Sequence, residues 1–148
     1  MRIARTALIV LVISVLTVVT AACSSNAPAT LQDIPVYAGA QPAEAGSNFV
    51  TDAMVKAIED SVAGQNLTSQ INLYELPEGT QWTDVKQFYT DQVGDDWKAS
   101  SDLTQEADVI NIIGWQRGSG ASEQALIVGQ AEDPLSGKVF LLTGLFSE

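Results

Sequence analysis

The sequence of 148 residues contains no histidine and a single cysteine, Cys23. Without histidine, neither a Ser-His-Asp triad nor a Cys-His pair can form. Zinc sites built on histidine or on several cysteines are excluded as well, and one cysteine cannot form a disulfide within the chain. Because these absences remove most routes to catalysis, we predict a protein that is not an enzyme and that holds no metal and no cofactor.

Basic residues are also scarce. The chain has 7 Lys and Arg against 18 Asp and Glu, a net charge of −11, and two of the seven, Arg2 and Arg5, precede the first apolar run. Without the first 22 residues the balance is 5 against 18, a net charge of −13. A surface this acidic repels phosphate backbones and anionic lipid headgroups. We therefore exclude nucleic acid as a partner and expect the charge to serve solubility.

The first 22 residues have the three parts of a secretory signal. MRIART carries two arginines and no acid, ALIVLVISVLTVV is an apolar stretch of 13 residues, and TAA supplies small residues before Cys23. The apolar stretch of a signal is about 7–15 residues long, whereas a spanning helix needs about 20. The 17 residues from Ala7 to Cys23 lie at the lower limit for spanning, so an uncleaved anchor helix stays open as the alternative.

The sequence TAAC at this point resembles the lipobox of bacterial lipoproteins, in which small residues precede an invariant cysteine. The resemblance implies that a signal peptidase cuts between Ala22 and Cys23. It also implies that Cys23 carries diacylglycerol through a thioether and can be acylated on its new N-terminus. The family usually has leucine three residues before the cysteine, where this chain has Thr20, and this difference bears on the efficiency of processing. Either topology places residues 24–148 on the extracytoplasmic side.

A tether is expected after the cysteine. The stretch SSNAPATLQ at 24–32 is small, polar and contains proline, a composition typical of linkers. Fully extended, its nine residues reach at most about 30 Å. We therefore predict a signal peptide at 1–22, a lipid-anchored tether at 23–32 and a single domain at 33–148 that stands just off the bilayer.

Apolar residues in the domain recur at two spacings. Helical spacing predicts helices within 46–64 and 80–94, with Ser47 or Asn48 as the first cap and Thr80 as the second. Alternation and turn residues predict strands within the following ranges: 66–76, 96–102, 107–117, 123–131 and 138–146. The segment 33–42 contains a proline and is either a short edge strand or an extended lead-in. The pattern is typical of an α+β fold with an antiparallel sheet of about five strands, ending in a three-strand meander.

The last three strands are apolar on both faces. In the final strand, for example, Phe140 and Leu142 alternate with Val139 and Leu141. A half-exposed antiparallel strand would have one polar face, so both faces of this sheet need cover. One helix on each face would supply it; two helices on one face would leave an apolar groove on the other for a ligand or partner.

Large rings are the best candidates for contact with a ligand or partner. Such rings are favoured in pockets and interfaces, although core packing is the competing interpretation. One side of a strand carries both Trp115 and Arg117, which we expect to stack on each other. The acidic clusters lack the spacing of a calcium loop, so no metal site is predicted. The candidate contact residues are Trp82, Trp97, Trp115 and Arg117.

The segments DIPVYAGAQP, LPEGTQWTDVKQFYTDQVGDDW and GWQRGSGASEQALIVG resemble short, functionally uncharacterised bacterial envelope lipoproteins. The resemblance covers about residues 33–131 and implies a small α+β domain without a known active site. We predict an extracytoplasmic protein held at the cell membrane by the lipid on Cys23. Its predicted role is a non-enzymatic binding or interaction module for an envelope protein. The alternative is a carrier of a small apolar ligand in a groove on the sheet face.

Overall fold

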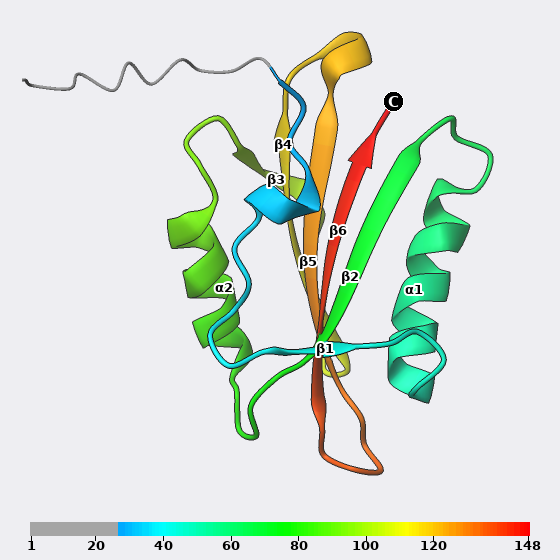
Figure 1. Ribbon diagram of the computed structural model, residues 1–148, viewed down its shortest axis with the longest axis vertical. Coiled ribbons are helices and arrows are strands. Elements are labelled where there is room, and N and C mark those ends of the chain that lie inside the picture. Colours follow the sequence, from blue (N-terminus) through cyan, green and yellow to red (C-terminus); the bar gives the residue numbers. More distant parts are fainter. Residues whose placement is uncertain (1–26) are drawn as a thin grey trace, which may run out of the picture.

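The computed structural model describes residues 27–148, so the predicted signal peptide, Cys23 and the first part of the predicted tether lie outside the described residues. The described part forms an antiparallel sheet of six strands in the order β1-β2-β6-β5-β4-β3. Two α-helices flank this sheet, one on each face (Figure 1). The predicted α+β class is confirmed, with six strands in place of about five.

The elements follow one another along the chain much as the sequence predicts. The strands are β1 Gln41–Ala43, β2 Thr68–Glu75, β3 Lys98–Glu106, β4 Ile110–Arg117, β5 Gln124–Glu132 and β6 Val139–Ser147. The α-helices are α1 Phe49–Val62 and α2 Trp82–Gln92, and two 3-10 turns are η1 Leu31–Asp33 and η2 Gly120–Ser122. The sixth strand is β1, which pairs with β2 at the sheet edge. Strand β3 is longer than expected because its register shifts between Ser100 and Gln105 and pairing then resumes.

The helix caps confirm one prediction and correct another. Asn48 caps α1, and its side-chain oxygen accepts a hydrogen bond of 2.6 Å from the Val50 amide. The cap residue of α2 is Gln81, not the predicted Thr80. The Thr80 hydroxyl instead donates to the Pro77 carbonyl at 2.6 Å, and its own amide donates to the same oxygen at 3.2 Å. Thr80 therefore closes the turn before the helix.

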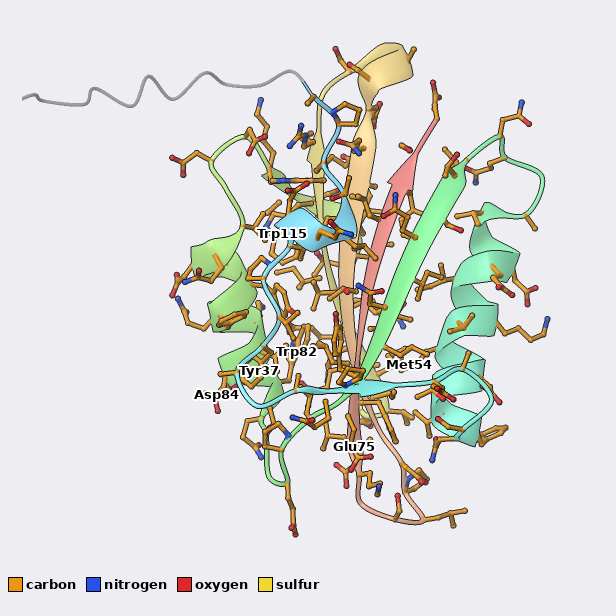
Figure 2. The ribbon with its side chains drawn as sticks, in the orientation of Figure 1. Tyr37, Met54, Glu75, Trp82, Asp84 and Trp115 are labelled. Atoms are coloured by element: carbon orange, nitrogen blue, oxygen red, sulfur yellow. The ribbon has the colours of Figure 1, made fainter. Side chains whose placement is uncertain are left out.

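The two apolar faces of the sheet are covered by different elements. The side chains of Val139, Leu141 and Leu145 join the larger hydrophobic cluster, to which α2 contributes Val85 and Tyr89. Phe140 and Leu142 join the smaller cluster with Val50 and Met54 of α1. Figure 2 shows Met54 on one side of the sheet and Trp82 and Trp115 on the other. The structure therefore has one helix on each face.

The beginning of the described chain packs onto the α2 side of the sheet. Ala29, Leu31 and Ile34 are buried there in the larger hydrophobic cluster. The buried Gln124 side chain accepts a hydrogen bond from the Ala29 amide at 2.8 Å and donates one to the Ala29 carbonyl at 3.0 Å. The last part of the predicted tether, from Ala29 to residue 32, is thus docked on the domain. Its small, polar composition does not reveal the amide at position 124 that receives it.

Candidate functional site

Two of the predicted contact residues are core residues on the α2 side. Trp97 is 9% exposed and Trp115 is 4% exposed, and both belong to the larger cluster. Trp82, at the start of α2, is half-buried, and its indole nitrogen donates to Glu106 Oε1 at 3.2 Å. Lys86 also pairs with that carboxylate oxygen, at 2.6 Å, and these two contacts hold the pKa of Glu106 below its ordinary value. Trp82 packs against the same cluster as the other two tryptophans, but it is less buried and its indole nitrogen bonds to Glu106.

Arg117 connects three segments at the end of the sheet where the described chain begins. Its guanidinium carbon lies 5.3 Å from the centroid of the Trp97 ring, which is a cation–π distance. Arg117 therefore stacks on Trp97, whereas the strand pattern predicts stacking on Trp115. It also pairs with Asp96, with 2.8 Å between Nη1 and Oδ2, and donates to the Ala27 carbonyl at 2.7 Å. These contacts occupy the guanidinium within the protein. A role for Arg117 and the tryptophans in partner contact stays a prediction.

Two polar atoms on the α2 side are buried without a hydrogen bond. They are the Tyr89 hydroxyl and Gln130 Oε1, and they are the only such atoms among the side chains that the structure describes. Burial raises the pKa of the Tyr89 hydroxyl, and Tyr74 adds a smaller increase. The Tyr37 backbone offsets part of this rise, although it forms no hydrogen bond with the hydroxyl. The Gln130 amide nitrogen does donate, to the Thr80 carbonyl at 3.2 Å. The close packing of the α2 side therefore leaves two buried polar atoms without a hydrogen bond.

The α1 side of the sheet is built differently, because three adjacent strands each present a glycine there. Gly114 and Gly144 both pair with Ile127, one from each neighbouring strand. A Cβ at Gly114 would lie 2.3 Å from Cβ of Leu103, and one at Gly144 would lie 3.0 Å from the Phe146 ring. Leu103 therefore lies over a position that only glycine leaves open, and Phe146 lies closely over Gly144. Glycine inside a strand marks such a close approach.

Beyond the C-terminal end of α1 this face opens into a groove of about 420 Å³. Its apolar surface, which we call the α1 groove, comprises Val62, Leu67, Leu103, Ala125, Ile127 and Phe146. All of these except Phe146 are partly exposed. Its polar rim comprises Gln65, Gln116, Glu123, Ser147 and Glu148. A volume of this size lies in the range of small-molecule sites, about 300–1,000 Å³.

Three large apolar side chains are exposed at the opposite end of the sheet. Phe49 is 85% exposed, Val109 71% and Leu135 96%; we call these three residues the distal surface. Val109 precedes Ile110, which pairs with Ala131 where β5 ends. Phe49 and Leu135 are brought to the same end by hydrogen bonds around one carboxylate.

That carboxylate belongs to Asp133, which organises the turn between β5 and β6. Its oxygens accept from Asn48 Nδ2 at 3.1 Å, from Ser136 Oγ at 2.6 Å and from the Leu135 amide at 2.9 Å. The contacts from Ser136, Leu135 and Asn48, in that order of size, hold the pKa of Asp133 below its ordinary value. The start of α1 is thereby fixed to the turn that carries Leu135.

The residues of the α1 groove and the distal surface are not among the contact residues predicted from the sequence. A signal for the groove is present, because each strand of the meander contains one internal glycine that no turn requires. The distal surface has no comparable signal, since exposure of a single Phe or Leu depends on the tertiary fold. Within 27–148 no helix is long and apolar enough to cross a membrane, and no group of three or more Cys, Asp or Glu is placed to hold a metal.

Comparison of the chain with protein-family models, with curated proteins and with solved structures gives no match. A functional proposal for this protein therefore depends on its own residues and their geometry.

Proposed function

We propose that this protein is a lipid-anchored, extracytoplasmic binding or interaction module without enzymatic activity, attached to the cell membrane through Cys23. The leader pattern supports the anchor. The docked N-terminal segment supports an orientation, because five residues separate Cys23 from Ala29, and six residue steps reach at most about 20 Å. The described chain begins at the end of the sheet that holds the β4–β5 hairpin (Figure 1). That end would face the membrane.

The observation that carries an interaction role is the distal surface. Three of the four large apolar side chains that are exposed within 27–148 lie at this end, away from the start of the described chain. Several large apolar side chains exposed at one end of a domain suit an interaction site, whereas single exposed apolar residues need no explanation. An anchor at the other end would direct this surface away from the bilayer, toward a protein of the envelope.

The anchor is tested by replacing the cysteine. The Cys23→Ala variant should incorporate no alkynyl palmitate in a bacterial host and should keep the mass of the precursor, with Ser24→Ala as the matched control. Unchanged labelling and mass in Cys23→Ala would refute lipid attachment. Unchanged membrane fractionation and size together would instead favour the spanning-helix alternative.

The interaction role is tested by photo-crosslinking from defined positions. A photoreactive amino acid at Leu135 should give a discrete crosslinked product in intact cells, and the same group at Val36, which is 49% exposed elsewhere, should not. Adding Phe49→Asp to the Leu135 probe should remove the product without lowering the unfolding temperature. Equal products from both probes, or none from Leu135, would exclude this surface as a docking site.

The second candidate function is a carrier of a small apolar ligand. The observation that favours it is the α1 groove, whose volume and partly exposed apolar walls suit a ligand of that class. The groove and the distal surface lie at opposite ends of the domain, so the two roles can be tested separately.

A further inference from the structure

We infer that the α1 groove binds the aliphatic tail of a single-chain amphiphile whose head group is positively charged. The inference depends on the second candidate function, the carrier, and specifies its ligand class. It does not depend on lipid attachment at Cys23.

The size of the groove favours a small molecule over a protein. Eleven residues line a volume of about 420 Å³, whereas a stable protein interface uses about 20–30 residues on each side.

The apolar part of the groove suits a flexible hydrocarbon chain. Its floor is Ile127 of β5, between Gly114 and Gly144 on the neighbouring strands. Because those two positions have no Cβ, Leu103 and Phe146 lie close to the sheet, and the groove extends across four strands, from β3 to β6. The lining is aliphatic apart from Phe146, so it offers dispersion contacts along a chain more than a face on which a planar ring would stack.

The polar rim specifies the charge of the head group. Glu123 and Glu148 lie on the rim, and no Lys or Arg is among the lining residues. Arg117 lines the adjoining hollow, which shares Glu123, Ser147 and Glu148 with the groove. Its guanidinium is already bound to Asp96 and Ala27 and stacked on Trp97. A carboxylate or phosphate head would be repelled at this rim, and an ammonium head would be attracted.

The position of the rim fits a ligand that arrives from a membrane. The β4–β5 hairpin, which precedes Glu123, lies at the same end as the start of the described chain (Figure 1). With the anchor in place, the rim would face the bilayer, and a tail could pass from one to the other over a short distance.

The test is photolabelling of the full chain reconstituted in phosphatidylcholine vesicles. The probes are hexadecylamine, hexadecanol and hexadecanoic acid, each with a diazirine in the middle of the chain, and the labelled residues are mapped by mass spectrometry. The amine should label Leu103 and Ile127 about fivefold more than the acid, as expected for one screened charge–charge contact.

Variants separate the groove from nonspecific labelling. Ala125→Phe fills the groove and should reduce labelling of Ile127 to background. Ala107→Phe, exposed in the turn between β3 and β4 at the other end of the sheet, should leave it unchanged. Glu123→Gln lies on the rim, outside the core, and should reduce the preference for the amine without changing labelling by the alcohol. It keeps the test decisive if Ala125→Phe fails to fold.

Three results would overturn the inference. Labelling that Ala125→Phe leaves unchanged would place the probe elsewhere, and equal labelling by acid and amine would exclude the charged head group. Stronger groove labelling in Cys23→Ala would mean that the chain's own lipid is the occupant. Failure of palmitate incorporation at Cys23 would refute the anchor and leave the photolabelling result intact.

Discussion

The two faces of the sheet differ in how completely they are filled. On the α2 side, α2, the N-terminal segment and the two buried tryptophans form one continuous cluster. On the α1 side a smaller cluster lies beneath one helix, and the face then opens into the groove. Most of the apolar packing therefore lies on the α2 side of the sheet, and part of the apolar surface on the α1 side stays exposed.

The difference arises from residues that are neighbours in sequence. Successive side chains of a strand point to opposite faces. In β4, Trp115 lies on the α2 side and Gly114 on the α1 side, and in β6 Leu145 and Gly144 are divided in the same way. Large residues therefore alternate with glycine in these strands, so large side chains fill the α2 side and glycines leave space on the α1 side.

The largest effect is expected from truncating a side chain of the filled face. Trp115→Ala should lower the free energy of unfolding by about 3–5 kcal/mol, because it opens a cavity in a closed cluster. Ile127→Ala, at the partly exposed floor of the groove, should cost about 1 kcal/mol because little additional area is buried there. Urea unfolding measures both. Equal losses would mean that the two faces contribute alike to stability.

The second prediction concerns two glycines on the α1 side of the sheet, whose replacement by alanine should change the stability in opposite directions. Gly114→Ala should destabilise by about 1–3 kcal/mol, because its Cβ would meet Leu103 at 2.3 Å. Gly129→Ala should instead stabilise by about 0.5 kcal/mol, because its Cβ would contact Met54 at an ordinary 3.6 Å and the unfolded chain loses freedom. Urea midpoints of the two variants provide the comparison, and a loss in both would indicate that α1 is packed as tightly as α2.

The third effect tests the filled face from the other direction. Tyr89→Phe should raise the free energy of unfolding by about 1 kcal/mol, because the hydroxyl is buried without a partner and its removal relieves a desolvation cost. Tyr37→Phe, on a half-exposed ring in edge contact with Phe88, serves as the control and should change stability little. Thermal unfolding measures both. A loss of stability in Tyr89→Phe would show that the hydroxyl is hydrogen-bonded in solution.

Local patterns in the sequence predict most of this fold, and contacts between distant residues account for what they miss. Apolar spacing places both helices, and Asn48 is recognisable as a cap because its bond to Val50 spans two residues. The docking of Ala29 depends on Gln124, 95 residues away, and the bond between Arg117 and Ala27 spans 90 residues. No local pattern specifies such pairs, so the extent of the tether and the stacking partner of Arg117 could not be read from composition.

The candidate site also has one part that local sequence patterns predict and another that depends on contacts between distant residues. The apolar character of both sheet faces is visible in β4, β5 and β6, and it correctly indicates that both need cover. How much of a face one helix covers depends on its length and on where it sits, and neither follows from spacing alone. Gly114 and Gly144 are informative only once the register pairs both of them with Ile127.

The smallest effect concerns the link that fixes α1 at its first turn. Because hydrogen bonds hold the pKa of Asp133 below its ordinary value in the folded state, the stability that it contributes is complete above about pH 5 and is lost as the pH falls through that lower pKa. Asp133→Asn should therefore be less stable at pH 7 and should lose less stability than the parent between pH 4 and pH 2, in urea midpoints. Asp95→Asn, in an exposed loop, is the control. Parallel curves for Asp133→Asn and the parent would contradict this link. If it holds, acid should expose the Val50 amide to hydrogen exchange before the Tyr89 amide, because the carboxylate holds the α1 side and the α2 side is held by apolar packing.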